Sequence, residues 1–234
     1  MKSHLPLLLI LILTNSGSLL GFDHALFNQL LQQHVSIDGK VNYKGFQADR
    51  SKLDLYLDQL KNAKAIESWN KEEQLAFYIN AYNSFTIQLI LDHYPVKSIN
   101  DIAQPWDKKF FTIQGKKMSL NELEHEILRK KFDEPRIHFA IVCASFSCPQ
   151  LRNEAFIANK INSQLEDQTR KFLSDKKRNL ISGERAEVSK IFSWFKADFT
   201  KNGSLVDFIN EYAEVKISKK TKIRFLPYNW SLNE

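Results

Sequence analysis

The sequence predicts an α+β fold in which several helices pack around one central, buried helix and against a small mixed or antiparallel sheet. The segment from Lys71 to about Asp92 has apolar residues on all sides, which is typical of a helix enclosed by the rest of the protein. Other helical segments carry an apolar stripe on one face only. Short alternating segments with turn residues lie between them, without the regular strand–helix alternation of a doubly wound fold.

Residues 1–21 have the pattern of a cleavable export signal. Lys2 is followed by an apolar run from Leu5 to Leu13, broken by Pro6, and then by small polar residues. This run is much shorter than the roughly 20 apolar residues that a membrane-spanning helix needs. We therefore expect an exported protein, periplasmic or extracellular, with no stable membrane span after cleavage.

The remaining residues, 22–234, are expected to form a single compact domain. The chain is 43% hydrophobic, which is enough to bury a sizeable core, and no Pro-, Gly- or Ser-rich stretch divides it. Its net charge is +6, but the basic clusters lie beside acidic residues or at element ends and have no interleaved aromatic residues. This favours a solvated surface over a nucleic-acid partner.

Helices are predicted over 22–34, 49–61 and 71–92 in the first half of the chain. A hairpin turning at Asp38-Gly39 is expected within 35–43. Tyr94-Pro95 ends the central helix. Asn80 and Asn83 lie inside that helix, where a buried amide needs partners. Either they tie the helix to neighbouring backbone, or they belong to a functional site.

In the second half, a hairpin is predicted over 110–118 and a capping box at 119–122 begins a helix. On this helix Glu124 falls within the apolar arc and His125 lies at its edge, so the carboxyl group needs a buried partner. Further elements follow in order. They are a strand over 135–143, a helix over 154–173, a hairpin over 179–189, short helices over 190–199 and 205–213, and a closing strand over 223–228.

At several of these stretches the chain resembles the bacterial members of the domain-of-unknown-function 547 family. The matching segments are 77–83, 119–125, 136–140, 143–149, 189–194 with 198–199, and 230–233. The resemblance implies one compact domain, often exported in bacteria, and brings no established reaction. Asn229 departs from the pattern because an Asp is expected before Trp230.

The first of three interpretations is a thiol nucleophile. Cys148 precedes Pro149 at a predicted helix N-terminus, where the helix dipole and free N–H groups stabilise a thiolate. On the predicted strand, period two places Arg136 and His138 on one face. His138 is then the base for Cys148, with Glu124 or Asn83 as the orienting group, and the substrate is an acyl or amide group.

The second interpretation is structural, with a disulfide between Cys143 and Cys148, an ion pair between Glu124 and Arg136, and a hydrogen-bonded core His138. The third is a metal site, such as a zinc site, whose ligands are His138, Cys143, Cys148 and either His125 or Glu124. A strand, however, points His138 and Cys143 to opposite faces. The sequence therefore predicts neither a metal nor another cofactor.

A non-catalytic role in binding or scaffolding is the main alternative to catalysis. Arg136 and His125, with the loop serines Ser145 and Ser147, are the candidate ligand-binding residues. The expected partner is a small molecule or peptide of the cell envelope.

Overall fold

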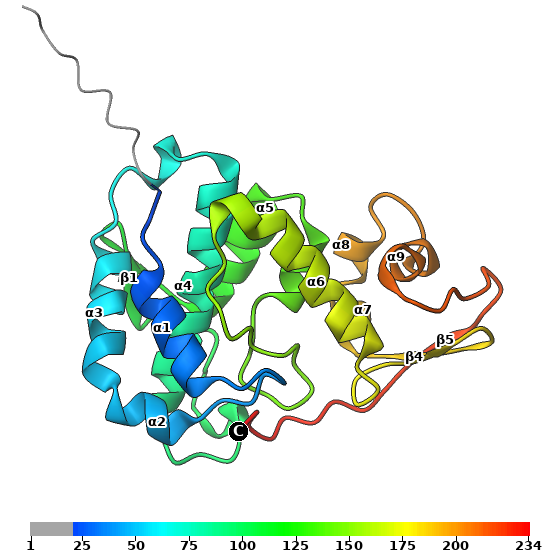
Figure 1. Cartoon of the computed structure of the whole chain (residues 1–234), viewed down its shortest axis with the longest axis horizontal. Helices are drawn as coiled ribbons and strands as arrows, with labels where there is room; N and C mark the ends of the chain where they lie inside the picture. Colours follow the sequence, from blue (N-terminus) through cyan, green and yellow to red (C-terminus); the bar gives the residue numbers. More distant parts are fainter. Residues whose placement is uncertain (1–20) are drawn as a thin grey trace, which may run out of the picture.

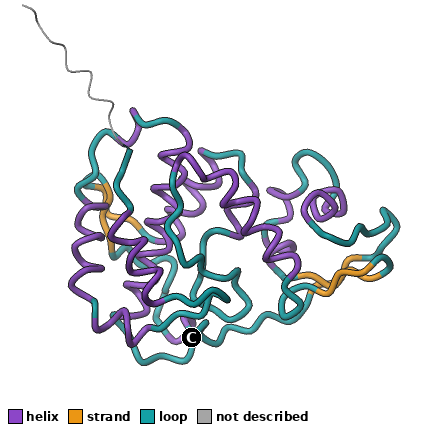
Figure 2. Tube along the Cα trace, in the orientation of Figure 1, coloured by secondary structure: helices purple, strands orange, loops and turns teal. Residues whose placement is uncertain are grey.

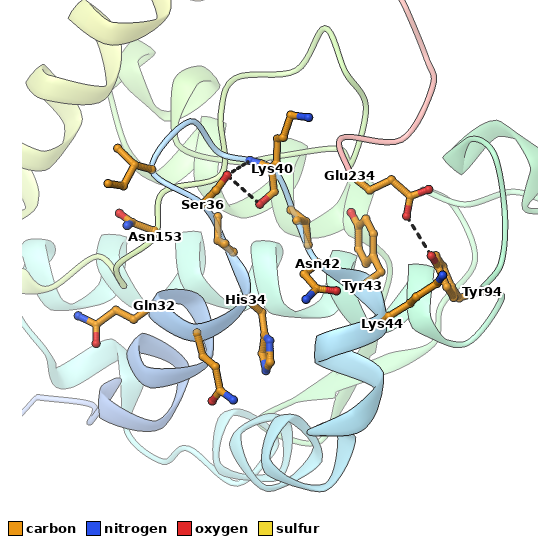
Figure 3. A pocket seen from close by; sticks show the side chains of 14 residues that line it. Gln32, His34, Ser36, Lys40, Asn42, Tyr43, Lys44, Tyr94, Asn153 and Glu234 are labelled. Atoms are coloured by element: carbon orange, nitrogen blue, oxygen red, sulfur yellow. Dashed lines mark hydrogen bonds between the residues drawn. The ribbon is translucent and has the colours of Figure 1, made fainter.

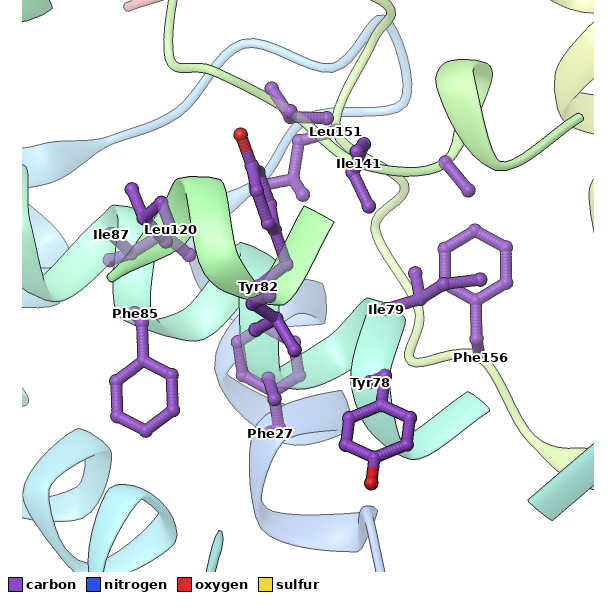
Figure 4. Packing of buried hydrophobic residues seen from close by; sticks show 14 of the residues in the cluster. Phe27, Tyr78, Ile79, Tyr82, Phe85, Ile87, Leu120, Ile141, Leu151 and Phe156 are labelled. Carbon is purple, nitrogen blue, oxygen red and sulfur yellow. The ribbon is translucent and has the colours of Figure 1, made fainter. Parts of the chain in front are cut away.

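The computed structural model describes residues 21–234, and its centre is helix α4 (Lys71–Leu91) (Figure 1). Asn70 and Glu73 close a capping box that begins this helix. Apolar side chains surround it on all sides, as Figure 4 shows for Tyr78, Ile79 and Phe85. The predicted α+β class and the central buried helix are confirmed. The predicted signal lies outside the described residues except for its last residue.

Three helices cover one side of α4: α1 (Ala25–His34), α2 (Tyr43–Ala48) and α3 (Arg50–Lys61). The hairpin predicted over 35–43 is reduced to a single bridge between Val35 and Val41. Gly39 adopts a φ of +78° in the turn, but α2 begins at Tyr43 and leaves no room for a second strand.

Two small sheets lie on opposite sides of the helical body (Figure 2). Strands β1 (Phe111–Ile113) and β2 (Lys116–Met118) form the predicted antiparallel hairpin. In the other sheet, β3 (Leu180–Ser182) pairs antiparallel with β4 (Arg185–Val188), which pairs parallel with β5 (Ile223–Phe225).

The prediction of a strand over 135–143 is wrong. Residues Pro135–Phe139 form a 3₁₀ helix, η4, and turns follow it. The Glu134 carboxylate accepts the Arg136 N–H and Pro135 occupies the first turn, so a short helix begins here. The apolar run was misleading because residues 137–142 are buried against α6 and α4, and a buried run of this length shows no helical period.

The helix predicted from residue 154 begins later, as a 3₁₀ turn η5 (Ala158–Lys160) that leads into α6 (Ile161–Ser174). The Asn80 side chain bonds both the N–H and the C=O of Phe156 and holds the preceding segment in a non-helical path. Cys148 therefore does not lie at a helix N-terminus, and the helix-dipole argument for its activation is wrong.

The buried residues form two clusters, one around α4 and a smaller one formed by α6, α7 (Ile191–Trp194), α8 (Lys196–Phe199), α9 (Leu205–Tyr212) and the second sheet. After β5, residues 226–234 run back along the molecule and end beside α2 (Figure 1). Bridges join Ser231 to Ser98 and Leu232 to Ser145. Within residues 21–234, no helix is long and apolar enough to cross a membrane.

Candidate functional site

A cavity of about 210 Å³ lies where the two buried clusters meet. Residues from six parts of the chain line it: α4, the loop before β1, the helix after β2, the segment 138–149, α7 with its following residue, and the C-terminal segment 226–234. The lining residues are Tyr82, Trp106, Asn121, Glu124, His125, His138, Ile141, Cys143, Cys148, Pro149, Ile191, Trp194, Phe195, Tyr228 and Trp230. Most of the groups singled out in the sequence therefore share one cavity.

The two cysteines are free thiols in direct contact in the cavity wall. Their Sγ atoms lie 2.8 Å apart, and the backbone N–H of Cys143 donates to Cys148 Sγ at 2.9 Å. Ser145 Oγ and Tyr228 Oη lie 3.2 and 3.4 Å from Cys143 Sγ. The predicted proximity of the cysteines is confirmed, but no disulfide joins them.

The surroundings shift the two thiol pKa values in opposite directions. The contact with the Cys148 thiol, together with the hydroxyl groups of Ser145 and Tyr228, lowers the pKa of Cys143 to about 6. Burial raises the pKa of Cys148 well above its usual value. The thiolate therefore resides on Cys143, which is half-buried, and not on the buried Cys148 that the sequence favoured.

A π-helix, η3 (Glu122–Leu128), carries Glu124 and His125 into the cavity. Such wide turns are rare and occur often at functional sites. Glu124 is buried, and its carboxyl group accepts a hydrogen bond from Tyr82 Oη at 3.2 Å. Burial raises the pKa of Glu124 to about 7, and the nearby Cys143 acts in the same direction. The carboxyl group can hence give or take a proton near neutral pH.

A chain of hydrogen bonds joins His138 and His125, which both line the cavity, through Asp198 and Arg129. His138 Nε2 donates to Asp198 Oδ2 at 2.7 Å, and Arg129 contacts both oxygens of that carboxylate at 2.6 and 3.0 Å. Arg129 also donates to His125 Nδ1 at 2.9 Å. Burial lowers the pKa of His138, so its ring is neutral at pH 7 with Nδ1 unprotonated. Phe195 stacks on the ring at 3.9 Å between centroids and fixes its orientation.

Aromatic side chains form the outer wall of the cavity. The ring centroids of Trp194 and Trp230 lie 5.9 Å apart and the two rings are stacked. The Tyr228 ring lies 4.8 Å from Trp194 and 4.6 Å from Trp230. Trp106 contacts the other side of Trp230 at 5.7 Å. Trp194 is 47% exposed, so this wall faces solvent at the cavity mouth. It offers apolar, planar surface to a ligand.

Two predicted site residues lie elsewhere or serve the backbone. Arg136 pairs with Glu134 at 2.6 Å and bonds Asn162, so the predicted ion pair between Glu124 and Arg136 does not form. The period-two argument failed because η4 is helical and turns Arg136 away from His138. Asn83 bonds the Ala140 C=O and the Val142 N–H, which confirms the backbone-tying interpretation.

The loop serines have different roles. Ser145 is fully buried and belongs to the thiol cluster, whereas Ser147 Oγ accepts the backbone N–H of Asn229 and anchors the C-terminal segment. Asn229 Oδ1 in turn accepts from both the N–H and the Oγ of Ser231. An Asp oxygen has the same acceptor capacity, so the departure at Asn229 preserves this turn.

Sequence reasoning missed Tyr82, Asp198 and Tyr228. Tyr82 was counted as part of the apolar surface of α4, and Asp198 lies 60 residues from His138 in the chain. Tyr228 was counted as the end of a strand. The segments that carry the family resemblance include Tyr82 and Asp198, which was the only signal for them.

A larger, open pocket of about 770 Å³ lies beside α1 and α2 (Figure 3). Several of its polar groups bond one another, as Ser36 does with Lys40 and Tyr94 with Glu234. His34 is held by Asp49 at 2.8 Å. No Cys lines this larger pocket, so the smaller cavity with the two thiols is the candidate site. Across residues 21–234, no group of three or more His, Cys, Asp or Glu side chains is arranged to hold a metal ion.

The geometry defines a cavity with a paired thiol and neighbouring acid–base groups. In comparison with known proteins, the model of the family described as "Protein of unknown function, DUF547" matches residues 66–173. The chain is similar to this family over that stretch, which includes α4, η3 and both cysteines. No curated protein and no solved structure matches the chain.

Proposed function

We propose that the protein is a cysteine-dependent hydrolase or acyltransferase whose nucleophile is Cys143. The observation that carries this proposal is the Cys143 thiol in the cavity wall, in contact with Cys148, Ser145 and Tyr228. A thiolate with a pKa near 6 is largely ionised at pH 7, and the thiolate is the reactive form.

The remaining groups of the cavity fit the steps of acyl transfer. The Cys143 thiolate attacks the carbonyl carbon, a sulfur–carbon bond forms, and the bond to the leaving group breaks while Glu124 protonates that group. Water or an acceptor alcohol or amine then attacks the thioester, and neutral His138, held by Asp198, accepts its proton. The thioester C–S bond then breaks and restores the Cys143 thiolate, while solvent returns a proton to Glu124 and takes one from His138.

The expected setting is outside the cytoplasm, with an envelope acyl or amide compound as substrate. This part of the proposal rests on the signal-like pattern of residues 1–21. Mass spectrometry of the protein from cells tests it. An N-terminus near residue 22 supports export, and a retained Met1 or Lys2 contradicts it.

The catalytic part is tested with p-nitrophenyl acetate and butyrate as acyl probes. Wild-type protein is expected to release p-nitrophenol and to accumulate an acetyl or butyryl group on Cys143, detected by peptide mass mapping. C143S is expected to release p-nitrophenol at least about 100-fold more slowly than the wild type, because the covalent nucleophile is removed. C148S removes the thiol that lowers the pKa of Cys143, so it is expected to be acylated more slowly than the wild type but still on Cys143. Acylation that persists in C143S, or none in the wild type, contradicts the proposal.

A further inference from the structure

We infer that Cys143 and Cys148 form a redox-active dithiol that reduces small, uncharged disulfides entering this cavity. The inference goes beyond acyl transfer because it requires both thiols, whereas acyl transfer requires only Cys143. The carrying observation is the Sγ–Sγ distance of 2.8 Å between two free thiols that both line the cavity.

The two thiols are placed for different steps of disulfide exchange. Cys143 is half-buried and lines the cavity, so it meets the incoming disulfide, while Cys148 is 4% exposed and its Sγ lies 2.8 Å from that of Cys143. The N–H of Cys143 donates to Cys148 Sγ at 2.9 Å. This hydrogen bond stabilises negative charge on the Cys148 sulfur in the second step of the exchange, in which Cys148 is the attacking group. An attacking thiol at the surface and a buried second thiol suit a two-step exchange.

In the first step the Cys143 thiolate attacks one sulfur of the substrate, R–S–S–R. A Cys143–S–R bond forms, the substrate S–S bond breaks, and one RS⁻ leaves. In the second step Cys148 attacks Cys143 Sγ, its proton passes to the departing second RS group, and the Cys143–Cys148 disulfide forms. The substrate gains two electrons, the dithiol loses two, and no other reactant is needed.

The cavity wall selects the class of disulfide. Its described lining contains neither Lys nor Arg, and Glu124 adds a carboxyl group beside Cys143. The guanidinium group of Arg129 is engaged by Asp198 and His125 behind the wall. A disulfide with several carboxylates, such as glutathione disulfide, therefore meets no cationic partner, whereas an uncharged disulfide meets the aromatic wall of Trp194, Tyr228 and Trp230.

The test uses reduced full-length protein with bis(2-hydroxyethyl) disulfide at pH 8, followed by intact-mass and peptide mass spectrometry. The wild type is expected to lose the mass of two hydrogens and to show one Cys143–Cys148 crosslinked peptide. C148S is expected to stop at the first step and keep one mercaptoethanol adduct on Cys143. C143S leaves only the buried thiol and is expected to react about 100-fold more slowly. Glutathione disulfide is expected to react with the wild type about tenfold more slowly, because of repulsion by the ionised Glu124.

Three results overturn the inference. They are a wild type that stays fully reduced, a C148S variant that shows no adduct on Cys143, and glutathione disulfide that reacts as fast as the uncharged probe. Failure of acyl transfer is a separate result, because it is scored in the wild type by p-nitrophenol release and acylation of Cys143. A protein that exchanges disulfides but is never acylated keeps this inference and loses the other proposal.

Discussion

The chemistry of the site depends on the local contacts of Cys143. Ala144 adopts a φ of +58°, an uncommon conformation for a residue with a side chain. It lies between Cys143 and Ser145, whose side chains both reach Tyr228 Oη, at 3.4 and 3.0 Å. Backbone conformations of this kind persist where the surrounding structure fixes them, as at binding and catalytic sites. No sequence pattern shows which of the two thiols meets Tyr228, so the sequence alone does not favour Cys143 over Cys148 as the nucleophile.

Glu124 provides a test of the buried site by pH. Its folded-state pKa of about 7 lies above the value near 4.3 of an unfolded chain, so the protonated carboxyl group stabilises the fold at low pH and this contribution is lost as pH rises through 7. Cys143 has the opposite pH dependence, since its pKa is lowered. We therefore compare the wild type with E124Q, which keeps an acceptor for Tyr82.

Urea unfolding of both proteins at pH 5 and pH 8 measures the effect. The free energy of unfolding of the wild type, relative to E124Q, is expected to fall by about 2 to 3 kcal/mol between the two pH values. A difference that stays constant with pH contradicts the burial and the raised pKa of Glu124.

Between elements, one carboxylate connects α8 to two helices of the larger cluster. Asp198 on α8 bonds His138 on η4 and Arg129, which follows η3. Although burial opposes it, these hydrogen bonds lower the pKa of Asp198. The contact orients His138 and ties α8 to the two helical segments that carry His138 and Arg129.

D198N is expected to lower the free energy of unfolding by about 2 kcal/mol at pH 7, because it leaves Arg129 and His138 without a charged acceptor. The matched control is D133N, since Asp133 is exposed and pairs only with Lys201. Its effect is expected to stay within about 0.5 kcal/mol. If D198N and D133N are equally stable in urea, the contact of Asp198 with His138 and Arg129 does not stabilise the fold.

The elements that the sequence predicts well are those whose signals are local. The apolar segment of α4 is longer than a strand, and the hairpin over 110–118 and the capping box at Ser119 and Glu122 each depend on a few neighbouring residues; all three predictions are confirmed. The prediction for 135–143 was wrong because an apolar run of this length suits a strand, and the buried residues 137–142 leave no polar face that would show a helical period. The late start of α6 depends on Asn80, a contact across 76 residues.

At the scale of the whole molecule, the C-terminal segment 226–234 completes the site. It supplies Tyr228 and Trp230 to the cavity and is then fastened to the larger cluster, where Leu232 is buried and Asn233 accepts a hydrogen bond from Tyr43 Oη at 2.8 Å. These contacts join residues up to 190 positions apart. No short-range pattern predicts them, which is why Tyr228 was not recognised as a site residue.

Removal of residues 227–234 is expected to lower the free energy of unfolding by about 3 kcal/mol, from the loss of Leu232 burial and the Tyr43–Asn233 bond. Removal of Glu234 alone breaks only the exposed bond to Tyr94 and is expected to change it by less than about 0.5 kcal/mol. Urea unfolding of the two shortened chains distinguishes them. If both are as stable as the full chain, the segment does not hold the site together.

The most direct test of the central claim, that Cys143 is the activated thiol of this cavity, is iodoacetamide labelling of the reduced native protein at pH 6 with peptide mapping. At this pH a thiol of pKa about 6 is half ionised and an ordinary thiol only about 0.3% ionised. After allowance for its weaker nucleophilicity, Cys143 is expected to react about tenfold faster than a free thiol. Y228F, which removes one hydroxyl group beside the Cys143 sulfur, is expected to slow the labelling of Cys143.

The predicted result is label on Cys143 with Cys148 unmodified. Label on Cys148 first, or on neither thiol until the protein is denatured, contradicts the account.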